Sequence, residues 1–267
     1  MAKLNIYITL YSALFVVAVN GIFVSSKEAN GLNELRERVK TLLVEDYMKT
    51  DFYLGRWLRA KEFDINAAEK MLVEHLRWRR INKMDTICNE NFDDMKREFP
   101  TTTDTFDKEG RPVGTLDVSQ WNIRNAVVTG RAPMLLRYIN MLMEHVTRQV
   151  LEIQKNKLNV TQWTVIMNAE GVNMINHGCR ACIQIWIQFM TSMDNNYPEW
   201  LHEFIGIDAP STAYTIVRIL QPFLSRHLRE HMRLFGTDSR NWRRYLDSKI
   251  SRDQRSEVYG GYRKSTY

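Results

Sequence analysis

Two short motifs in the sequence contain the residue types that metal or redox chemistry needs. His227, Glu230 and His231 form an H-x-x-E-H pattern. On a helix this spacing places both imidazoles on one face, as a zinc ion requires, with the glutamate as a base. Cys179 and Cys182 form a lone C-x-x-C in a segment of helical periodicity. Without a second pair or a neighbouring redox fold, this spacing predicts two buried small side chains rather than a metal or redox site.

Neither the histidine motif nor any other pattern stands in a setting that supports catalysis. Arg226, Arg229 and Arg233 crowd the two histidines and would repel a metal cation. Asp104 and Asp107 resemble a pair of acids, but a tight turn between two strands explains both. The sequence contains no G-x-S-x-G, P-loop or G-x-G-x-x-G motif. We therefore predict no catalytic residue, no metal ion and no cofactor, and we expect a protein that is not an enzyme.

The composition indicates how the apolar side chains of this chain are used. The 267 residues are 44% hydrophobic, enough for one large domain or for a main domain with a small helical companion. Eleven Phe, eleven Tyr, seven Trp and thirteen Met supply many large and adaptable apolar side chains. Such side chains fill ordinary cores, and they also suit the irregular wall of a pocket for an apolar ligand. Composition alone leaves both interpretations open.

Positive charge is concentrated at the C-terminal end. The formal net charge is +6, and residues 218–267 alone hold twelve Lys and Arg against five Asp and Glu. The rest of the chain is therefore close to neutral. This basic C-terminal part predicts contact with an anionic membrane surface, and a plain solvated surface is the alternative. Because no known nucleic-acid-binding motif is present, we expect no nucleic-acid partner.

Residues 1–26 have the outline of a targeting segment. Lys3 is followed by an apolar run without charge until Lys27, and small residues precede Lys27 at a position where a peptidase can cut. We interpret this segment as a cleaved signal peptide, which places the protein in the secretory-pathway lumen or outside the cell. Residues 4–24 are nearly long enough to span a bilayer, so a membrane anchor is the first alternative. A cytoplasmic protein is the second.

Hydrophobic periodicity divides the remaining chain into two parts. Residues 27–98 predict a small helical unit, with helices over 32–48, from Asp51, and from a cap at Asp64 to about residue 80. Over residues 99–267 short strand-like runs alternate with long helical ones, which predicts an α/β fold with a mixed sheet covered by helices. The expected strands are 103–106, 113–116, 163–167, 204–207 and 232–235. The expected helices are 133–155, 179–193, 211–224 and 238–246.

Eight stretches of this chain, in order, resemble one known family. They are DFYLGRWLRAKEFDINAAEKMLVEHLRWRR (51–80), DKEGRPV (107–113), VIMNAEG (165–171), NNYPEW (195–200), IGIDAP (205–210), VRILQPFLS (217–225), and the closing pair LFG (234–236) and YGG (259–261). Their order and spacing resemble the CRAL-TRIO lipid-binding domain family, and within it the branch of supernatant protein factor and the yeast phosphatidylinositol-transfer protein. The likeness extends from about residue 51 to residue 261.

The resemblance implies a bowl-shaped domain that binds, shields and transfers one hydrophobic lipid or lipophilic small molecule. In such a domain the sheet forms the pocket floor and a mobile helix, here 211–224, forms a gate. An interaction scaffold that keeps the fold without the pocket is the alternative function. The residues expected to touch ligand are Trp163, Val165, Trp186, Met190, Tyr197, Glu199, Ile207, Tyr214, Val217 and Leu220. Phe223 and Leu224 are expected to meet the membrane when the gate opens.

A few departures from the family pattern bear on the ligand. Phosphoinositide-binding members hold the headgroup with the glutamate of the YPE motif, here Glu199, and with a lysine before the LFG strand. The lysine position is occupied by His231, or its role is displaced to Arg233. Asn168 stands where the family has aspartate, and Gln221 where it has lysine. These changes favour a neutral lipid, or a sterol-like, retinoid-like or tocopherol-like molecule, as the ligand.

Overall fold

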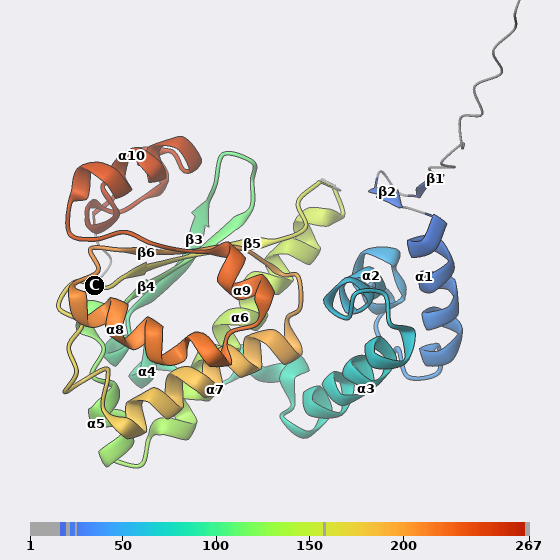
Figure 1. The fold of residues 1–267 in the computed structure, drawn as a ribbon, viewed down its shortest axis with the longest axis horizontal. Helices are drawn as coiled ribbons and strands as arrows, with labels where there is room; N and C mark the ends of the chain where they lie inside the picture. The colour runs from blue at the N-terminus through green and yellow to red at the C-terminus, as the bar shows by residue number, and fades with distance from the viewer. Residues whose placement is uncertain (1–16, 20–21, 25, 157–158, 265–267) are drawn as a thin grey trace, which may run out of the picture.

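The chain folds into a helical unit and a larger α/β part that lie side by side (Figure 1). The computed structural model describes residues 17–19, 22–24, 26–156 and 159–264. The expected signal peptide or anchor over 1–26 falls largely outside these residues. Within it, only two short antiparallel strands are described, β1 (Val17–Val19) and β2 (Ile22–Val24). In the described part of the chain, no helix has the length and apolar character needed to cross a bilayer.

Three helices build the helical unit: α1 (Ser26–Val39), α2 (Asp51–Ala60) and α3 (Ile65–Ile81). Capping side chains fix two of their starts. Thr50 accepts a hydrogen bond from the backbone N–H of Tyr53, and Asp64, as expected, accepts one from the backbone N–H of Ala67. Asp51, from which the sequence predicts a helix, is the first residue of α2.

The first helix ends earlier than the sequence predicts. Apolar spacing predicts a helix to about Met48, and this is wrong because α1 stops at Val39. A turn after Val39 returns Leu43 and Met48 to the same buried core, so their apolar character reflects packing and not a longer helix. The 3₁₀ helix η1 (Asp46–Lys49) leads into α2, and the connection from α3 to the sheet uses the 3₁₀ helix η2 (Met84–Asn89) and helix α4 (Asp93–Glu98).

A five-stranded mixed sheet forms the centre of the α/β part, in the spatial order β3-β4-β5-β6-β7. The first pair is an antiparallel hairpin, and the other neighbours are parallel, which requires the helical crossovers that the sequence predicts. The strands are β3 (Thr101–Phe106), β4 (Pro112–Asp117), β5 (Trp163–Asn168), β6 (Leu201–Ile207) and β7 (Met232–Leu234). The expected α/β class with an N-terminal helical unit is confirmed.

Helices cover both faces of this sheet (Figure 1). They are η3 (Val118–Gln120), α5 (Ile123–Val128), α6 (Ala132–Gln154), α7 (Arg180–Asn196), α8 (Ser211–Leu220), η4 (Gln221–Phe223), α9 (Arg226–His231), α10 (Ser239–Lys249), η5 (Arg252–Gln254) and η6 (Glu257–Tyr259). The expected helix over 211–224 is therefore shorter in the structure. Pro222 lacks a backbone N–H, so the chain continues after Leu220 as a 3₁₀ turn.

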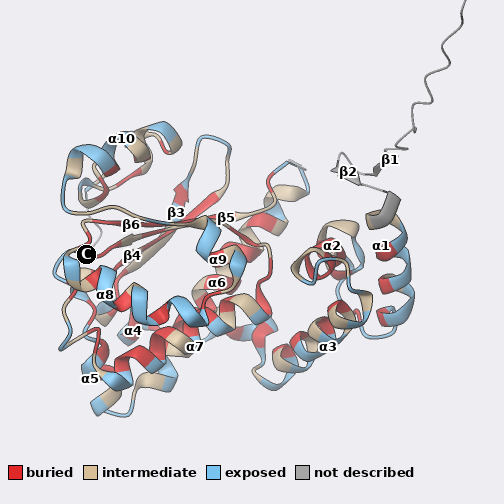
Figure 2. Cartoon of the chain, in the orientation of Figure 1, coloured by how far each residue is buried: buried red, intermediate tan, exposed pale blue. Residues whose placement is uncertain are grey.

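Side-chain alternation along the strands gives the sheet two separate cores. Ile166, Ile205 and Ile207 point to one face, where they pack with Trp242 and Leu246 of α10. Intervening positions point to the opposite face, which is covered by α6, α7 and α8 and belongs to the main core. Figure 2 shows the central strands β4, β5 and β6 as the most continuously buried part of the fold. Any ligand site between a helix and the sheet must therefore use one of these two faces.

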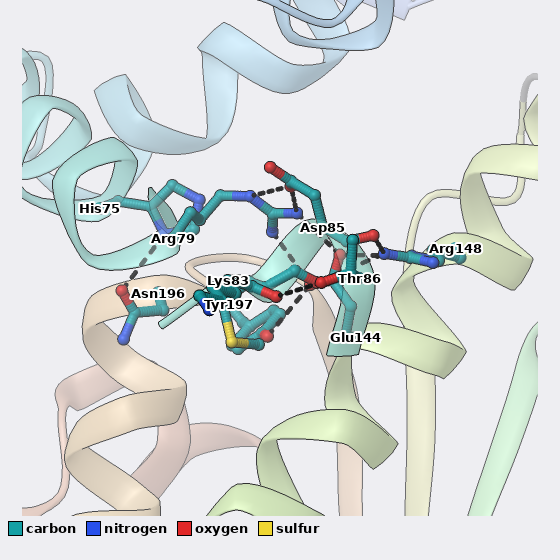
Figure 3. A network of polar contacts seen from close by, with 10 residues as sticks. His75, Arg79, Lys83, Asp85, Thr86, Glu144, Arg148, Asn196 and Tyr197 are labelled. Atoms are coloured by element: carbon teal, nitrogen blue, oxygen red, sulfur yellow. Dashed lines mark hydrogen bonds and ion pairs between the residues drawn. The ribbon is translucent and has the colours of Figure 1, made fainter. Parts of the chain in front are cut away.

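A buried ion pair joins the helical unit to the α/β part (Figure 3). Arg79 of α3 donates two hydrogen bonds to the carboxylate of Glu144 in α6, at 2.9 and 3.0 Å, and also pairs with Asp85. The Tyr197 hydroxyl donates to the same carboxylate at 3.2 Å, and the Arg148 guanidinium lies 3.4 Å from it. Burial and the neighbouring Glu144 charge raise the pKa of Tyr197 well above its usual value.

Candidate functional site

An apolar cavity lies between α8 and the sheet, and we call it the lid cavity. Its wall is almost wholly apolar, and its volume is about 40 Å³ in this conformation. Helix α7 and the strands supply one side, with Met167, Trp186, Met190, Phe204, Met232 and Leu234. Helix α8 and its flanks supply the other, with Ala213, Ile216, Val217, Leu220 and Leu224, and Val118 and Val172 close the ends. This lining suits an apolar molecule, because no group is present that could pair with a charge.

A second apolar cavity lies deeper on the same face of the sheet, and we call it the inner cavity. It also measures about 40 Å³. It lies between α6, α7 and the strands β3 to β5, and its lining includes Gly114, Leu116, Trp121, Ile139, Leu142, Met143, Val146, Trp163, Val165 and Phe189. Thr101, Thr102 and Thr103 of β3 also border it.

Aromatic rings separate the two cavities. Trp186 lines the lid cavity, whereas Trp121 and Phe189 line the inner cavity. The indole rings of Trp121 and Trp186 are parallel with centroids 6.5 Å apart, and Phe189 lies 6.5 Å from Trp186. The Trp186 indole N–H donates to the carbonyl of His177 at 3.1 Å, so its only polar atom is directed away from the cavities. We call these three rings the aromatic wall.

The volumes of the cavities decide what the observed conformation can hold. A space of about 40 Å³ accommodates only a few water molecules. A lipid is far larger, so it enters only if α8 moves outward or the aromatic wall rearranges. The observed conformation therefore has no room for a whole lipid.

Helix α8 has the two-sided character that a mobile lid needs. Ala213, Ile216 and Leu220 face the cavity and are buried. On the outer side, Tyr214 is 41% and Ile219 42% exposed, and in the following turn Phe223 is 50% exposed. Exposed apolar side chains on both helix and turn can exchange water for a membrane when the lid opens.

The C-terminal end of the lid is held by a small polar cluster. Ser225 donates from its backbone N–H and its hydroxyl to the carboxylate of Asp194 in α7, at 3.1 and 2.6 Å. Arg229 donates to the carbonyl of Leu224 at 2.7 Å. Burial raises the pKa of Asp194, and the two hydrogen bonds from Ser225 oppose that effect. These contacts tie the end of the lid to α7 and to α9.

The structure brings together many of the residues that the sequence singled out. Trp186, Met190, Val217, Leu220 and Leu224 line the lid cavity. Trp163 and Val165 line the inner cavity instead, beyond the aromatic wall. Tyr214 is directed outward and donates to the carbonyl of Leu234 at 3.3 Å, and Phe223 lies on the outer side of the lid.

Four of the expected ligand contacts, including the outward-directed Tyr214, lie outside both cavities. Ile207 faces α10 on the opposite side of the sheet, because β6 alternates and Phe204 takes the cavity side. Tyr197 belongs to the buried network around Glu144. Glu199 lies where α2 meets the α/β part and has a left-handed backbone conformation with φ of 61°. In this structure none of these residues lines either cavity.

The residues expected to hold a phosphoinositide headgroup are only partly together. The Glu199 carboxylate lies 3.6 Å from the Arg59 guanidinium and 3.5 Å from Nδ1 of His227. His231 stacks on His227 at 4.1 Å, and its Nδ1 contacts the backbone carbonyl of His227. Arg233 pairs with Glu203 at 2.7 Å rather than with Glu199. His231 and Arg233, which were expected to take the place of the headgroup lysine, therefore do not place a positive charge against the Glu199 carboxylate.

Several lining residues were missed at the level of sequence. Ile139, Leu142, Met143 and Val146 have the i, i+3, i+4, i+7 spacing of one helix face, and that signal was visible in 133–155. Met167 and Phe204 occupy alternate positions of strands that were predicted correctly as strands. What the sequence did not reveal was which of two covered faces each position would join.

The motifs with possible chemistry have structural roles. The His227 Nε2 atom contacts the carbonyl of Leu201 at 3.0 Å, and Glu230 pairs with Arg226. In the described residues no group of three or more His, Cys, Asp or Glu side chains is placed to bind a metal ion. The Asp107 carboxylate accepts the backbone N–H groups of Glu109 and Arg111, which is the turn role that the sequence predicts.

Cys179 and Cys182, which the sequence predicts as two buried small side chains, form a disulfide, and of the two Cys182 is fully buried. Cys179 is the cap residue of α7, and Cys182 lies in the first turn of that helix. This places their Cα atoms 4.9 Å apart, within the range that a disulfide bridges. Cys88 is a free thiol.

The comparisons with known proteins agree with this geometry. A family model described as the CRAL/TRIO domain matches residues 96–261. The protein named Protein real-time of Drosophila melanogaster is 25% identical over 238 residues, which cover 86% of this chain and 36% of that protein. The Aedes aegypti protein of the same name is 23% identical over 79% of this chain and 33% of its own length. The chain thus spans about a third of the length of these relatives.

A solved structure shows the same fold. The crystal structure of Sfh5 superposes with a TM-score of 0.71 and covers 92% of this chain and 90% of that one, at 15% sequence identity.

Proposed function

Since this chain belongs to the CRAL/TRIO domain family, we propose that it binds one hydrophobic molecule beneath α8 and transfers it when α8 opens. The observation that carries this proposal is the lid cavity, whose almost wholly apolar wall is closed by a helix with exposed apolar residues on its outer side. The role is binding and shielding rather than catalysis. It is the hydrophobic effect that provides the affinity, about 25 cal/mol for each Å² of apolar surface removed from water.

The chemistry of the lining indicates the class of ligand. No charged side chain borders the lid cavity or the inner cavity, so a charged headgroup buried there would lack a partner. The ligand is therefore a neutral lipid or a sterol-like, retinoid-like or tocopherol-like molecule. Because the two cavities lie on one face of the sheet, an elongated molecule would reach from the lid past the aromatic wall.

The ligand proposal is tested by filling the cavity. Purified protein is extracted with organic solvent, and the extract is analysed by mass spectrometry before and after incubation with neutral lipid vesicles. Ile216→Trp places a large ring on the cavity side of α8, whereas Ile219→Trp places the same ring on its outer side. We expect wild type and Ile219→Trp to hold lipid and Ile216→Trp to hold at least tenfold less. Wild-type protein that never takes up a hydrophobic molecule would overturn the proposal.

For the membrane, we propose contact through the outer side of α8 with help from the basic C-terminal part. Tyr214, Ile219 and Phe223 supply apolar surface, and Arg218 is exposed beside them. Many cations of 218–267 are engaged in ion pairs, for example Arg240 with Asp238. We therefore expect vesicle binding to depend more on the apolar side chains than on salt. Phe223→Ser should weaken sedimentation with vesicles of phosphatidylcholine and phosphatidylserine, and unchanged binding would contradict this role.

A second candidate function is an interaction scaffold that keeps the fold and binds no lipid. The small volume of the two cavities, about 40 Å³ each, favours it. The extraction experiment separates the two functions, because a scaffold yields no lipid from wild type or from either tryptophan variant.

We also propose that the protein enters the secretory pathway, on the basis of the apolar run and the small residues within 1–26. N-terminal sequencing of protein from its native source tests this. A mature chain that begins near Lys27 supports a cleaved signal peptide, and a chain that begins at Met1 or Ala2 contradicts it.

A further inference from the structure

The helical unit contains a recess larger than either cavity under α8. It lies between the segment 42–48 and the outer side of α3, and it encloses about 460 Å³ of open space. Leu42, Val44 and Met48 form one wall, and Val73 and Leu76 of α3 form the other. We call this recess the α3 groove. It shares no lining residue with the lid cavity or the inner cavity.

The apolar side chains of the α3 groove are unusually exposed for their type. Leu42 is 45%, Val73 39% and Val44 81% exposed. They are gathered in one recess instead of being scattered singly over the surface. A gathered set of this kind marks a surface that is covered by a partner.

Three exposed cations line the same groove. Arg77, Arg80 and Lys83 contribute to its wall, and in the described part of the chain their side chains form no ion pair or hydrogen bond. Arg79, from the same turn of α3, differs because it is buried and paired with Glu144 and Asp85. The free cations therefore belong to the groove and not to the core.

The balance of charge in the groove is positive. Its two carboxylates are Asp85, which already pairs with Arg79, and Glu45 on the opposite wall. Three unpaired cations on one side thus face a mostly apolar strip on the other. A ligand that fits must present acidic groups to the cations on one wall and a large apolar side chain to the apolar strip on the other.

We propose that the α3 groove binds a short acidic segment of a partner protein that inserts a large apolar side chain. The recessed shape favours a peptide over a membrane, because a flat bilayer surface meets protruding side chains and cannot enter a recess. Apolar anchors buried in a groove and flanked by charge pairs are the usual way in which a protein recognises such a segment.

The test is a selection of peptides on the intact protein. Wild type and the double variant Arg77→Glu/Arg80→Glu are each used to select from a displayed library of random 16-residue peptides. We expect wild type to enrich sequences in which Asp or Glu flanks a Leu, Phe, Trp or Met, and the double variant to enrich none of them. A selected peptide, labelled with fluorescein, should bind the double variant at least tenfold more weakly than wild type.

Controls separate the groove from general charge and from misfolding. Arg244→Glu reverses an exposed cation of α10 that has no ion pair in the described residues, and it should leave peptide binding unchanged. Val73→Ser removes an apolar contact without changing charge, and it should weaken binding by several-fold. Circular dichroism must show that every variant is folded.

Four outcomes would overturn the proposal. One is enrichment of peptides without acidic residues, and another is equal binding by wild type and the double variant. A third is that no peptide is enriched while vesicles containing 30% phosphatidylserine bind through the same residues, which would make the groove a membrane contact. The last is dimerisation that Arg77→Glu/Arg80→Glu abolishes, which would make the partner a second copy of this chain.

Discussion

At the scale of single residues, the most consequential contact is the ion pair between Arg79 and Glu144. Both side chains are buried, and the carboxylate also accepts from Tyr197. A buried pair of this kind is weak evidence for net stabilisation, because both charges lose their hydration. Removal of one partner alone has a larger effect, since the other charge then stays buried without compensation.

This gives a prediction for Glu144. Glu144→Gln leaves the buried Arg79 charge with only the largely exposed Asp85 as a carboxylate partner, and we expect the free energy of unfolding to fall by about 3 kcal/mol. Arg79→Met/Glu144→Leu removes both charges and should be closer to wild type than Glu144→Gln. Chemical denaturation with urea measures both. A double variant that is less stable than Glu144→Gln would show that the pair itself, and not the unpaired charge, matters.

His75 gives a prediction about pH. Burial, assisted by the nearby Arg79 charge, lowers the pKa of His75 to about 3. Between about pH 6.5 and pH 3 the unfolded chain therefore binds a proton at this site that the folded chain does not. Stability should fall as pH decreases through this window, by up to about 1.4 kcal/mol per pH unit from this group.

His75→Gln is the matched variant for this effect. Glutamine retains a donor toward Asn196, whose side-chain oxygen lies 3.2 Å from Nδ1 of His75. Urea denaturation at pH 7 and pH 5 measures the slope, and the variant should have a shallower slope than wild type. Equal slopes would mean that proton binding by His75 in this pH window does not differ between the folded and the unfolded chain.

At the scale of elements, the opening that we propose depends on the contacts that hold the C-terminal end of α8. The lid is anchored at its C-terminal end by Asp194 and Ser225. Loss of a buried hydrogen-bond acceptor costs about 1–3 kcal/mol when its donors stay buried. The closed state is therefore sensitive to one carboxylate on a different helix.

Asp194→Ala should make the lid open more often. The backbone N–H of Ser225 would lose its acceptor, so we expect faster hydrogen exchange of the amides in 221–229, by roughly tenfold for each 1.4 kcal/mol lost. Asp194→Asn keeps an acceptor oxygen and should exchange more slowly than Asp194→Ala. Mass spectrometry after proteolysis measures both. Exchange equal to wild type in Asp194→Ala would show that the hinge is held by other contacts.

The sequence predicts the elements better than it predicts the site. Strands such as 163–167 and the hairpin around Asp107 follow from short apolar runs and turn residues, which are local signals. Helices cover both faces of the sheet, so β6 has buried apolar residues on both of its faces. For this reason the sequence predicted Ile207 as a pocket residue. A run that is apolar on both faces does not reveal which face meets the ligand. The pairing of Arg79 with Glu144, 65 residues apart, has no local signal at all.

At the scale of the whole molecule, the helical unit and the α/β part are held as one body by side chains that cross between them. Arg56 of α2 is buried between the rings of Phe52 and Trp200, whose centroids lie 4.1 and 3.8 Å from its guanidinium carbon. It donates to the carbonyls of Glu199, at 2.6 Å, and Thr161. Together with the Arg79 pair, this contact makes the two parts depend on each other.

Arg56→Ala should loosen that dependence. Two carbonyl acceptors and two aromatic faces would lose their partner, so we expect a loss of at least about 3 kcal/mol and a separate early transition for the helical unit. Arg59→Ala, on the same helix but more exposed, should retain a single transition. Scanning calorimetry distinguishes the two shapes. A single, unshifted transition in Arg56→Ala would contradict the role assigned to Arg56.

The redox state of the two cysteines at the start of α7 depends on the cellular compartment that holds the protein. A bridged Cys179–Cys182 pair leaves Cys88 as the one thiol among the three cysteines. Disulfides persist in the secretory pathway and are kept reduced in the cytosol. Protein that is unfolded in the presence of an alkylating reagent at the moment of cell lysis should therefore carry one label if it resided in an oxidising compartment, and three labels if it did not. The number of labels per chain thus reports whether the molecule was in an oxidising or a reducing compartment before lysis.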